Sequence, residues 1–388
     1  MKSLIKLPAL IDPHVHFRVP GESYKEDWRT AAKAAIRGGV TTVCDMPNNS
    51  PPCTTFEQLQ SKKKAIDGEL KSAGIPLRYG LYFGADKNRL DQIALVGSSC
   101  IALKIFMGSS HKGLVIDTDE ALHEAFQRAR DANLLVAVHA EDEAILAVKR
   151  REFAGAAHAA LHSRMRPREA AISATARAIE LAKTYQTPLY LLHISTKEEL
   201  DLVRQAKREK LPVYMEVTPN HLFLNESDYA ELGTLAQINP PLREAEDQEA
   251  LWEGIRDGTI DTIGTDHAPH TLKEKQQPFG KAPSGIPGIE TLLPLMLDAV
   301  QRNLLTLDRL IELTRKNAEK IFKLPPNEDV VVVDLEREKT ISDREIFSKC
   351  GWTPYRGKKI RGWPIYTQIG NQLFDVTTNP RKVEGKLL

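Results

Sequence analysis

Eight short runs of apolar and β-branched residues alternate with amphipathic segments along most of this 388-residue chain. Each run has the length of a buried strand, and the amphipathic segments are rich in Ala, Glu, Lys and Arg, which favour helices. The runs cover residues 9–16, 40–46, 77–83, 101–107, 134–139, 189–193, 212–218 and 259–264. Helical patterns lie near residues 26–37, 54–72, 87–97, 118–132, 167–186, 196–209, 245–257, 288–302 and 306–322. Strands that are each followed by a helix predict an α/β fold of the (β/α)8 TIM-barrel type.

An open, doubly wound sheet is the main competing architecture for this alternation. The first run is not followed by a Gly-x-Gly-x-x-Gly pattern, and the chain has no Walker loop. Nucleotide binding therefore has no support in the sequence, and the barrel is preferred.

The pattern changes beyond residue 323. Pro325 and Pro326 end the last helical segment, and no helical pattern follows them. Short apolar runs indicate strands at 330–335, 360–362 and 365–370. We expect a barrel of residues 8–323 and a small β-rich domain of residues 324–388, to which residues 1–7 add one strand.

Composition excludes several classes of partner. The net charge of +1 gives no bulk attraction to nucleic acid or to an anionic membrane. The four cysteines are scattered and form no Cys-x-x-Cys pair, which is typical of a reducing compartment. No apolar run approaches the roughly 18 residues that span a bilayer. We expect a cytoplasmic protein.

Four of the predicted strands end in side chains that bind metals. His14 and His16 share one face of the first strand, because alternate residues of a strand point the same way. The fifth, sixth and eighth strands end at His139, His193 and Asp266. A single histidine at a strand end is more often a core or surface group than a ligand. Five such groups at one mouth of a barrel favour a metal site.

The fourth run contains Lys104 among apolar residues. Such a lysine either extends its ammonium group to solvent or is desolvated, which lowers its pKa and makes the amine nucleophilic. A neutral amine reacts with carbon dioxide to give a carbamate, whose two oxygens can bridge two cations. The metal-binding residues at the same mouth favour the carbamate.

The longest stretches expected to be irregular are 139–166, 219–244 and 265–287, all of which follow predicted strands. Long loops at this face of a barrel are where active sites are built. Residues 107–113 are either an ordinary Gly/Ser turn or a mobile lid. If they form a lid, deleting Ser109 and Ser110 lowers turnover without loss of zinc.

Longer motifs surround these residues. They are Asp12-Pro-His-Val-His-Phe-Arg18, Asp45-Met-Pro-Asn48, Glu216-Val-Thr-Pro-Asn-His221-Leu-Phe, Asn239-Pro-Pro-Leu-Arg243, Asp266-His-Ala-Pro-His270 and Cys350-Gly-Trp-Thr-Pro-Tyr-Arg-Gly. The ligands on successive strands resemble the amidohydrolase superfamily, and the motifs resemble dihydroorotase over nearly the whole chain. The likeness is closest to the type I enzymes, including the dihydroorotase domain of the animal multifunctional pyrimidine-synthesis protein.

The resemblance implies reversible cyclisation of N-carbamoyl-L-aspartate to L-dihydroorotate in pyrimidine biosynthesis. It implies two Zn²⁺ per chain, bridged by carboxylated Lys104 and by a hydroxide that acts as nucleophile. Asp266 would be the general acid and base that moves the proton to and from the ring nitrogen. One zinc would be held by His14, His16, Lys104 and Asp266, and the other by Lys104, His139 and His193.

The substrate carries a carboxylate, and a guanidinium group binds carboxylates bidentately. Arg18 lies one alternate position beyond His16 and is expected to lean over the metals. The resemblance assigns Arg18, Asn48 and His270 to the carboxylate, and Asn239 and Gly285 to further substrate contacts. From the residues alone, Asn48 is better explained as a turn residue, and His270 is equally well explained as a surface histidine.

Some positions depart from the family pattern. A third metal has been associated with a cysteine before the strand 6 histidine and with residues matching Glu216 and His221. Leu192 replaces that cysteine here and argues against a third metal.

Two other functions stay open. An allantoinase or hydantoinase would share every metal ligand, but Arg18 and Asn48 favour a substrate with a carboxylate. A non-catalytic scaffold relative usually has eroded ligands, whereas all six are present here. We further expect a homodimer that associates with other enzymes of pyrimidine synthesis.

Overall fold

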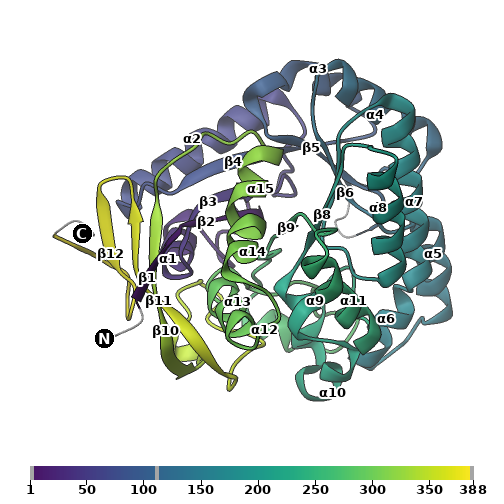
Figure 1. The fold of residues 1–388 in the computed structure, drawn as a ribbon. Helices are drawn as coiled ribbons and strands as arrows, with labels where there is room; N and C mark the ends of the chain where they lie inside the picture. The colour runs from purple at the N-terminus through teal and green to yellow at the C-terminus, as the bar shows by residue number, and fades with distance from the viewer. Residues whose placement is uncertain (1–3, 110–112, 385–388) are drawn as a thin grey trace.

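The computed structural model describes residues 4–109 and 113–384, which form two sheets with helices around the larger one (Figure 1). The larger sheet has eight parallel strands that neighbour one another in chain order. The strands are β2 (Leu10–Val15), β3 (Val40–Asp45), β4 (Arg78–Gly84), β5 (Ala102–Phe106), β6 (Val136–His139), β7 (Leu189–Leu191), β8 (Val213–Val217) and β9 (Thr262–Ile263). A parallel bridge between Val15 and His267 joins the first and last strands. The predicted TIM barrel is confirmed.

Helices follow the strands and cover the outside of the barrel. They are α1 (Trp28–Arg37), α2 (Phe56–Ala73), α3 (Ile93–Val96), α4 (Asp119–Asp131), α7 (Arg168–Tyr185), α8 (Lys197–Arg208), α11 (Ala245–Arg256), α13 (Leu292–Gln301), α14 (Leu307–Ile311) and α15 (Asn317–Ile321). Asp27, Thr55 and Thr196 begin α1, α2 and α8 with capping boxes, which satisfy backbone N–H groups of the first turn. The helix predicted near 306–322 is interrupted by a π-helical turn, Glu312–Lys316.

Five further helices lie in the stretches that were expected to be irregular, and the expectation is wrong there. They are α5 (Glu143–Glu152), α6 (His162–Met165), α9 (Pro219–Phe223), α10 (Tyr229–Leu232) and α12 (Leu272–Lys275). Asp142 begins α5 by accepting the N–H groups of Ala144 and Ile145. The other four are one turn long, so they are too short to show an apolar period in the sequence.

The second sheet is antiparallel and contains five strands in the order β1-β10-β11-β12-β13. These are β1 (Leu4–Pro8), β10 (Val330–Thr340), β11 (Lys359–Ile369), β12 (Gln372–Asp375) and β13 (Arg381–Val383). The N-terminal strand pairs with β10, with Leu4 opposite Asp334. The two strands predicted within 360–370 are one continuous strand, β11, and β12 and β13 were not predicted. Of the strand predicted within residues 1–7, residues 1–3 lie outside the described residues.

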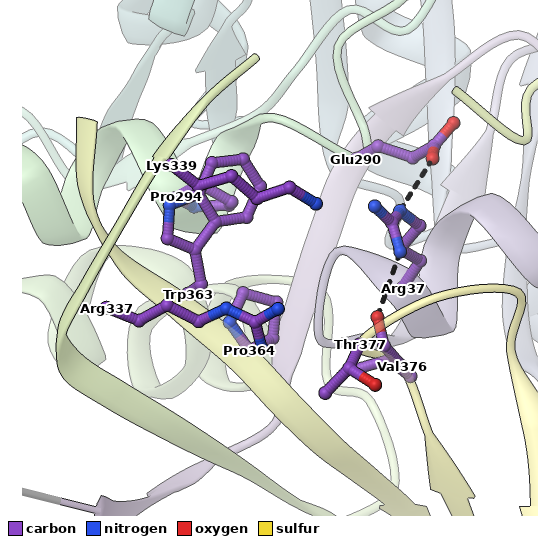
Figure 2. Close-up of a pocket in the computed structure, with 9 residues that line it drawn as sticks. All are labelled: Arg37, Glu290, Pro294, Arg337, Lys339, Trp363, Pro364, Val376 and Thr377. Atoms are coloured by element: carbon purple, nitrogen blue, oxygen red, sulfur yellow. Dashed lines mark hydrogen bonds and ion pairs between the residues drawn. The ribbon is translucent and has the colours of Figure 1, made fainter. Parts of the chain in front are cut away.

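Arg37 joins the barrel to the small sheet. It lies at the end of α1, and its Nη1 donates to the carbonyl oxygens of Val376 (2.9 Å) and Thr378 (2.7 Å). Its Nε lies 3.5 Å from Glu290, in the loop before α13. Figure 2 shows this seam, with Arg37 facing the Lys339 and Trp363 side chains of the small sheet. The small domain is therefore bound to the barrel through specific polar contacts.

Phe322, just after α15, fills the interior of the barrel. Its ring packs edge-on against Tyr82 of β4 and Tyr190 of β7, with centroid distances of 5.9 and 4.8 Å. Aromatic packing of this kind closes the space inside the strands and leaves the opposite mouth for a site. Within residues 4–109 and 113–384, every helix is too short or too polar to cross a lipid bilayer.

Candidate metal centre

Three predicted ligands meet where β2 and β9 end. His14 is the fifth residue of β2, His16 follows that strand, and Asp266 lies three residues after β9. Nε2 of His14 and Nε2 of His16 lie 3.1 and 3.0 Å from Oδ1 of Asp266. One ligand atom from each residue falls within 4.8 Å of the others, which is the arrangement a metal ion needs.

His139 and His193 form a second pair at the neighbouring strand ends. Nδ1 of His139 lies 2.9 Å from Nε2 of His193, and both side chains are buried. The ring of His193 is 5.4 Å from that of His14, which places the two clusters side by side. Nδ1 of His193 has no hydrogen-bond partner among the described residues. Burial lowers the pKa of both imidazoles, which keeps them neutral, as ligands must be.

Lys104 lies in β5 and is buried beside these histidines. Within the described residues its Nζ makes no hydrogen bond, and it lies 4.5 Å from the ring centre of Phe106. Burial lowers the pKa of Lys104 to about 7, although the charges of Asp266 and Glu216 oppose the shift. A large fraction of this amine is therefore neutral and nucleophilic at physiological pH.

Glu216, at the end of β8, orients two of the histidines. Its Oε1 lies 2.7 Å from Nδ1 of His14 and accepts the backbone N–H of His193, while Tyr190 donates to Oε2. Burial alone lowers the pKa of His14, but the carboxylates of Asp266 and Glu216 outweigh it and raise that pKa. A carboxylate on Nδ1 leaves Nε2 of His14 facing the metal-binding space. The sequence analysis associated Glu216 only with a third metal and missed this orienting contact.

Glu141 orients His139 in the same way. Its Oε2 lies 2.7 Å from Nε2 of His139, and Arg166 binds the same carboxylate. Burial raises the pKa of Glu141, but Arg166 and His139 outweigh it and hold the pKa well below its usual range. Glu141 was visible in the sequence as the second residue after His139. Arg166 carried no such signal, because only the fold brings it from a distant loop.

Two of the predicted substrate residues lie together above this centre. Nη2 of Arg18 is 3.1 Å from Nε2 of His270, and Nε of Arg18 donates to the carbonyl oxygen of Pro269. Gly285 is buried against them, because a Cβ added there would lie 2.9 Å from Cδ2 of His270. Burial, together with the charges of Arg18 and two lysines, keeps the pKa of His270 well below its usual value.

The two predicted asparagines have other partners. Oδ1 of Asn48 lies 2.8 Å from Nδ1 of His16, so Asn48 contacts a candidate ligand directly. Oδ1 of Asn239 lies 3.0 Å from Nε2 of His162. Each asparagine is half-buried, and the amide nitrogen makes no hydrogen bond within the described residues. Both amide groups therefore keep donors for a ligand.

Backbone strain is concentrated at this mouth. The φ angles of Arg18, His193 and Asp266 are 65°, 38° and 46°. Residues with side chains seldom adopt these left-handed angles, and each costs energy that the surrounding fold must supply. At these three positions the left-handed backbone changes the direction in which the side chain leaves the chain at the strand end.

The residues considered for a third metal have other neighbours in the structure. Leu192 offers no donor and is buried, and Glu216 already has three hydrogen-bond partners. His221 lies 2.8 Å from Thr218 Oγ1 and 3.2 Å from the carbonyl oxygen of Pro240. Of the predicted lid, residues 110–112 lie outside the described residues, so the lid stays a prediction.

The residues present fit divalent cations. The imidazoles of four histidines and the carboxylate of Asp266 face one another across a small space, and such mixed nitrogen and oxygen donors suit zinc. A barrel with such side chains at its strand ends defines a class of metal-dependent amide hydrolases. The chain belongs to this class: the Amidohydrolase family matches residues 5–328, and the protein is an enzyme of that family.

Particular relatives are more informative still. The chain is 38% identical over 387 residues to the dihydroorotase of Methanosarcina acetivorans, covering 94% of this chain and 80% of that protein. It is 37% identical over 361 residues to the multifunctional protein CAD of Squalus acanthias, covering 92% of this chain but only 14% of that protein's length. The solved L-hydantoinase of Arthrobacter aurescens superposes with a TM-score of 0.92 at 27% identity, covering 98% of this chain and 87% of that one.

Proposed function

We propose that this protein is a dihydroorotase, which interconverts N-carbamoyl-L-aspartate and L-dihydroorotate. The observation that carries the proposal is the pairing of Arg18 with His270 beside the candidate metal centre, near enough for the Arg18 charge to act on His16 and Asp266. A guanidinium group there binds a carboxylate attached close to the bond that reacts. Similarity to dihydroorotases of archaea and bacteria at 34–38% identity supports the same substrate.

We propose a centre of two zinc ions bridged by carboxylated Lys104. His14, His16 and Asp266 would hold one ion, His139 and His193 the other, and Lys104 both. Bound zinc supplies Lewis-acid polarisation of the amide carbonyl and an activated water. The unpaired Nζ of Lys104 and the facing imidazoles of His139 and His193 support this assignment.

Asp266 is suited to move the proton. Burial raises its pKa, but His14, His16 and Lys104 outweigh that effect and hold the pKa well below its usual range. The group is therefore a carboxylate at neutral pH, ready to accept a proton. In hydrolysis Asp266 would take a proton from the attacking water and pass it to the departing ring nitrogen; in synthesis it would take a proton from the ureido nitrogen and give it to the departing hydroxide. Arg18, Asn48 and His270 meanwhile bind the substrate carboxylate, and Asn239 and Gly285 complete the pocket.

A hydantoinase is the second candidate, because solved hydantoinases share the whole fold. Simple hydantoins carry no carboxylate, so they leave the charge of Arg18 unused in a buried position, which is costly. The dihydroorotase proposal therefore accounts for a residue that the alternative does not.

Turnover decides between them. Ring opening of dihydroorotate is followed by ultraviolet absorbance with zinc and bicarbonate supplied, beside hydantoin and allantoin, with Lys104→Ala as control. Rapid turnover of dihydroorotate alone, lost in the control, is expected. Turnover of hydantoin but not of dihydroorotate would overturn the proposal.

We also propose that the enzyme is cytoplasmic and homodimeric, that it associates with other enzymes of pyrimidine synthesis, and that residues 8–323 and the remainder are its two domains. Support comes from four buried, unpaired cysteines and from the similarity to the multifunctional CAD protein. Light scattering on purified protein tests the dimer, and a monomeric mass would exclude it.

A further inference from the structure

A fully buried lysine lies beside the site without a role in the chemistry above. Lys275 is the last residue of α12 and is 0% exposed. Its Nζ donates to the carbonyl oxygens of Gln237 (3.0 Å) and Pro283 (2.9 Å) and lies 5.8 Å from the ring centre of Trp352. Within residues 4–109 and 113–384, no carboxylate forms an ion pair with it, and burial is the one cause that shifts its pKa. Burying an ammonium group without a carboxylate is costly, and burial lowers the pKa of Lys275 to about 7.

The contacts of Lys275 lead directly to the substrate residues. The carbonyl oxygen of Gln237 also accepts the N–H of Gly285 (2.9 Å). The carbonyl oxygen of Ser284, one residue earlier, lies 3.1 Å from Nε2 of His270. Trp352 donates to the carbonyl oxygen of His270 (2.8 Å), so the ring beside the ammonium group holds the same loop.

The other cations of this region are partly neutralised. Arg18 lies 3.8 Å from Glu22, and Lys25 pairs with Glu22 (2.5 Å) and Glu274 (3.6 Å). Lys275 has only neutral hydrogen-bond acceptors, so the charge of its protonated form, which part of the molecules carry at neutral pH, is not cancelled locally. In a buried region of low dielectric, an uncancelled charge acts over a longer distance than at the surface.

We propose that Lys275 determines specificity for an anionic substrate. Its charge, held behind His270 and Gly285, adds to the positive potential of Arg18 and favours a ligand that carries a carboxylate. The inference rests on the proposed function and deepens it, because it names a residue that selects the substrate class without touching the reacting atoms. Lys275 is in this sense a positioning residue.

The test compares two substrates that differ only in the carboxylate: dihydroorotate and 5,6-dihydrouracil. Lys275→Met removes the charge and keeps the length of the side chain, and Lys273→Met on the exposed side of α12 is the matched control. We expect kcat/KM for dihydroorotate to fall about tenfold through KM, while the value for dihydrouracil changes less than about twofold. The zinc content and the control variant should match the wild type.

An equal loss for both substrates would show that Lys275 only holds the loop, and no loss for either would show that its charge is irrelevant; both results overturn the inference. If Lys275→Met does not fold, Lys275→Arg and Lys275→Gln replace it. The arginine variant should then keep the preference for dihydroorotate that the glutamine variant loses. Failure of the wild type to turn over dihydroorotate would instead overturn the proposed function, and the inference with it.

Discussion

Glu216→Gln tests whether a buried carboxylate strengthens zinc binding at the candidate metal centre. Glu216 is fully buried and lies 2.7 Å from Nδ1 of His14, with Tyr190 at 2.9 Å and the His193 N–H at 3.2 Å. Glutamine has the same shape and still offers an oxygen to His14, but it has no charge. The variant therefore removes the electrostatic contribution and keeps the packing.

The expected loss follows from the strength of the hydrogen bond. A bond to a charged acceptor contributes about 1.5–3 kcal/mol, against about 1 kcal/mol for a neutral acceptor. The difference, about 0.5–2 kcal/mol, corresponds to a roughly two- to thirtyfold weaker zinc affinity. The free energy of unfolding of the metal-free protein should change little, because glutamine keeps the packing and can keep the hydrogen bonds to His14, Tyr190 and the His193 N–H.

Zinc affinity is measured by competition with a chelator, and stability by thermal unfolding of the metal-free protein. Glu209→Gln, which alters an exposed glutamate paired with Lys183, is the control. A zinc affinity within about twofold of the wild type would refute the orienting role of Glu216. A large fall in the melting temperature of the metal-free variant would show that Glu216 acts chiefly in folding.

Three further predictions address the loop, the core and the domain seam. Gly285→Ala should raise KM at least about tenfold with zinc content unchanged. The reason is that the new Cβ would lie 2.9 Å from Cδ2 of His270 and push that side chain away. An unaltered KM, measured by steady-state kinetics, would contradict this prediction. In the wild type, Nζ of Lys62 lies 2.6 Å from the buried carboxylate of Asp45. Lys62→Met leaves that carboxylate without its partner, so the free energy of unfolding, measured by denaturant titration, should fall by about 3–5 kcal/mol. Burial raises the pKa of Glu290 to about 7, so between about pH 4.5 and 7 the folded state retains a proton that the unfolded state has lost. The free energy of unfolding attributable to this group should therefore fall by about 3 kcal/mol as the pH rises through that range, and Glu290→Gln should abolish the dependence in pH-resolved denaturation.

The predictable part of the fold came from periodicity. Buried parallel strands require continuous apolar runs, and amphipathic helical patterns alternated with these runs along the chain, so the eight strands were visible in order. The one-turn helices and the strands β12 and β13 were missed, because segments this short are formed by contacts with the rest of the protein.

The candidate site likewise has a part that the sequence predicted and a part that only the structure revealed. The chain itself determined which ligand types stand at strand ends, since a parallel barrel brings all those ends to one mouth. Only the tertiary structure decided which nitrogen of each imidazole faces the centre, because Glu216 reaches His14 from a distant strand and Arg166 holds the Glu141 carboxylate from a distant loop. It also placed Asn48 against His16 and Lys275 behind His270, contacts that depend on loop conformation. The contacts of Glu216 with His14 and of Arg166 with Glu141 join residues far apart in sequence, so no local pattern encodes them.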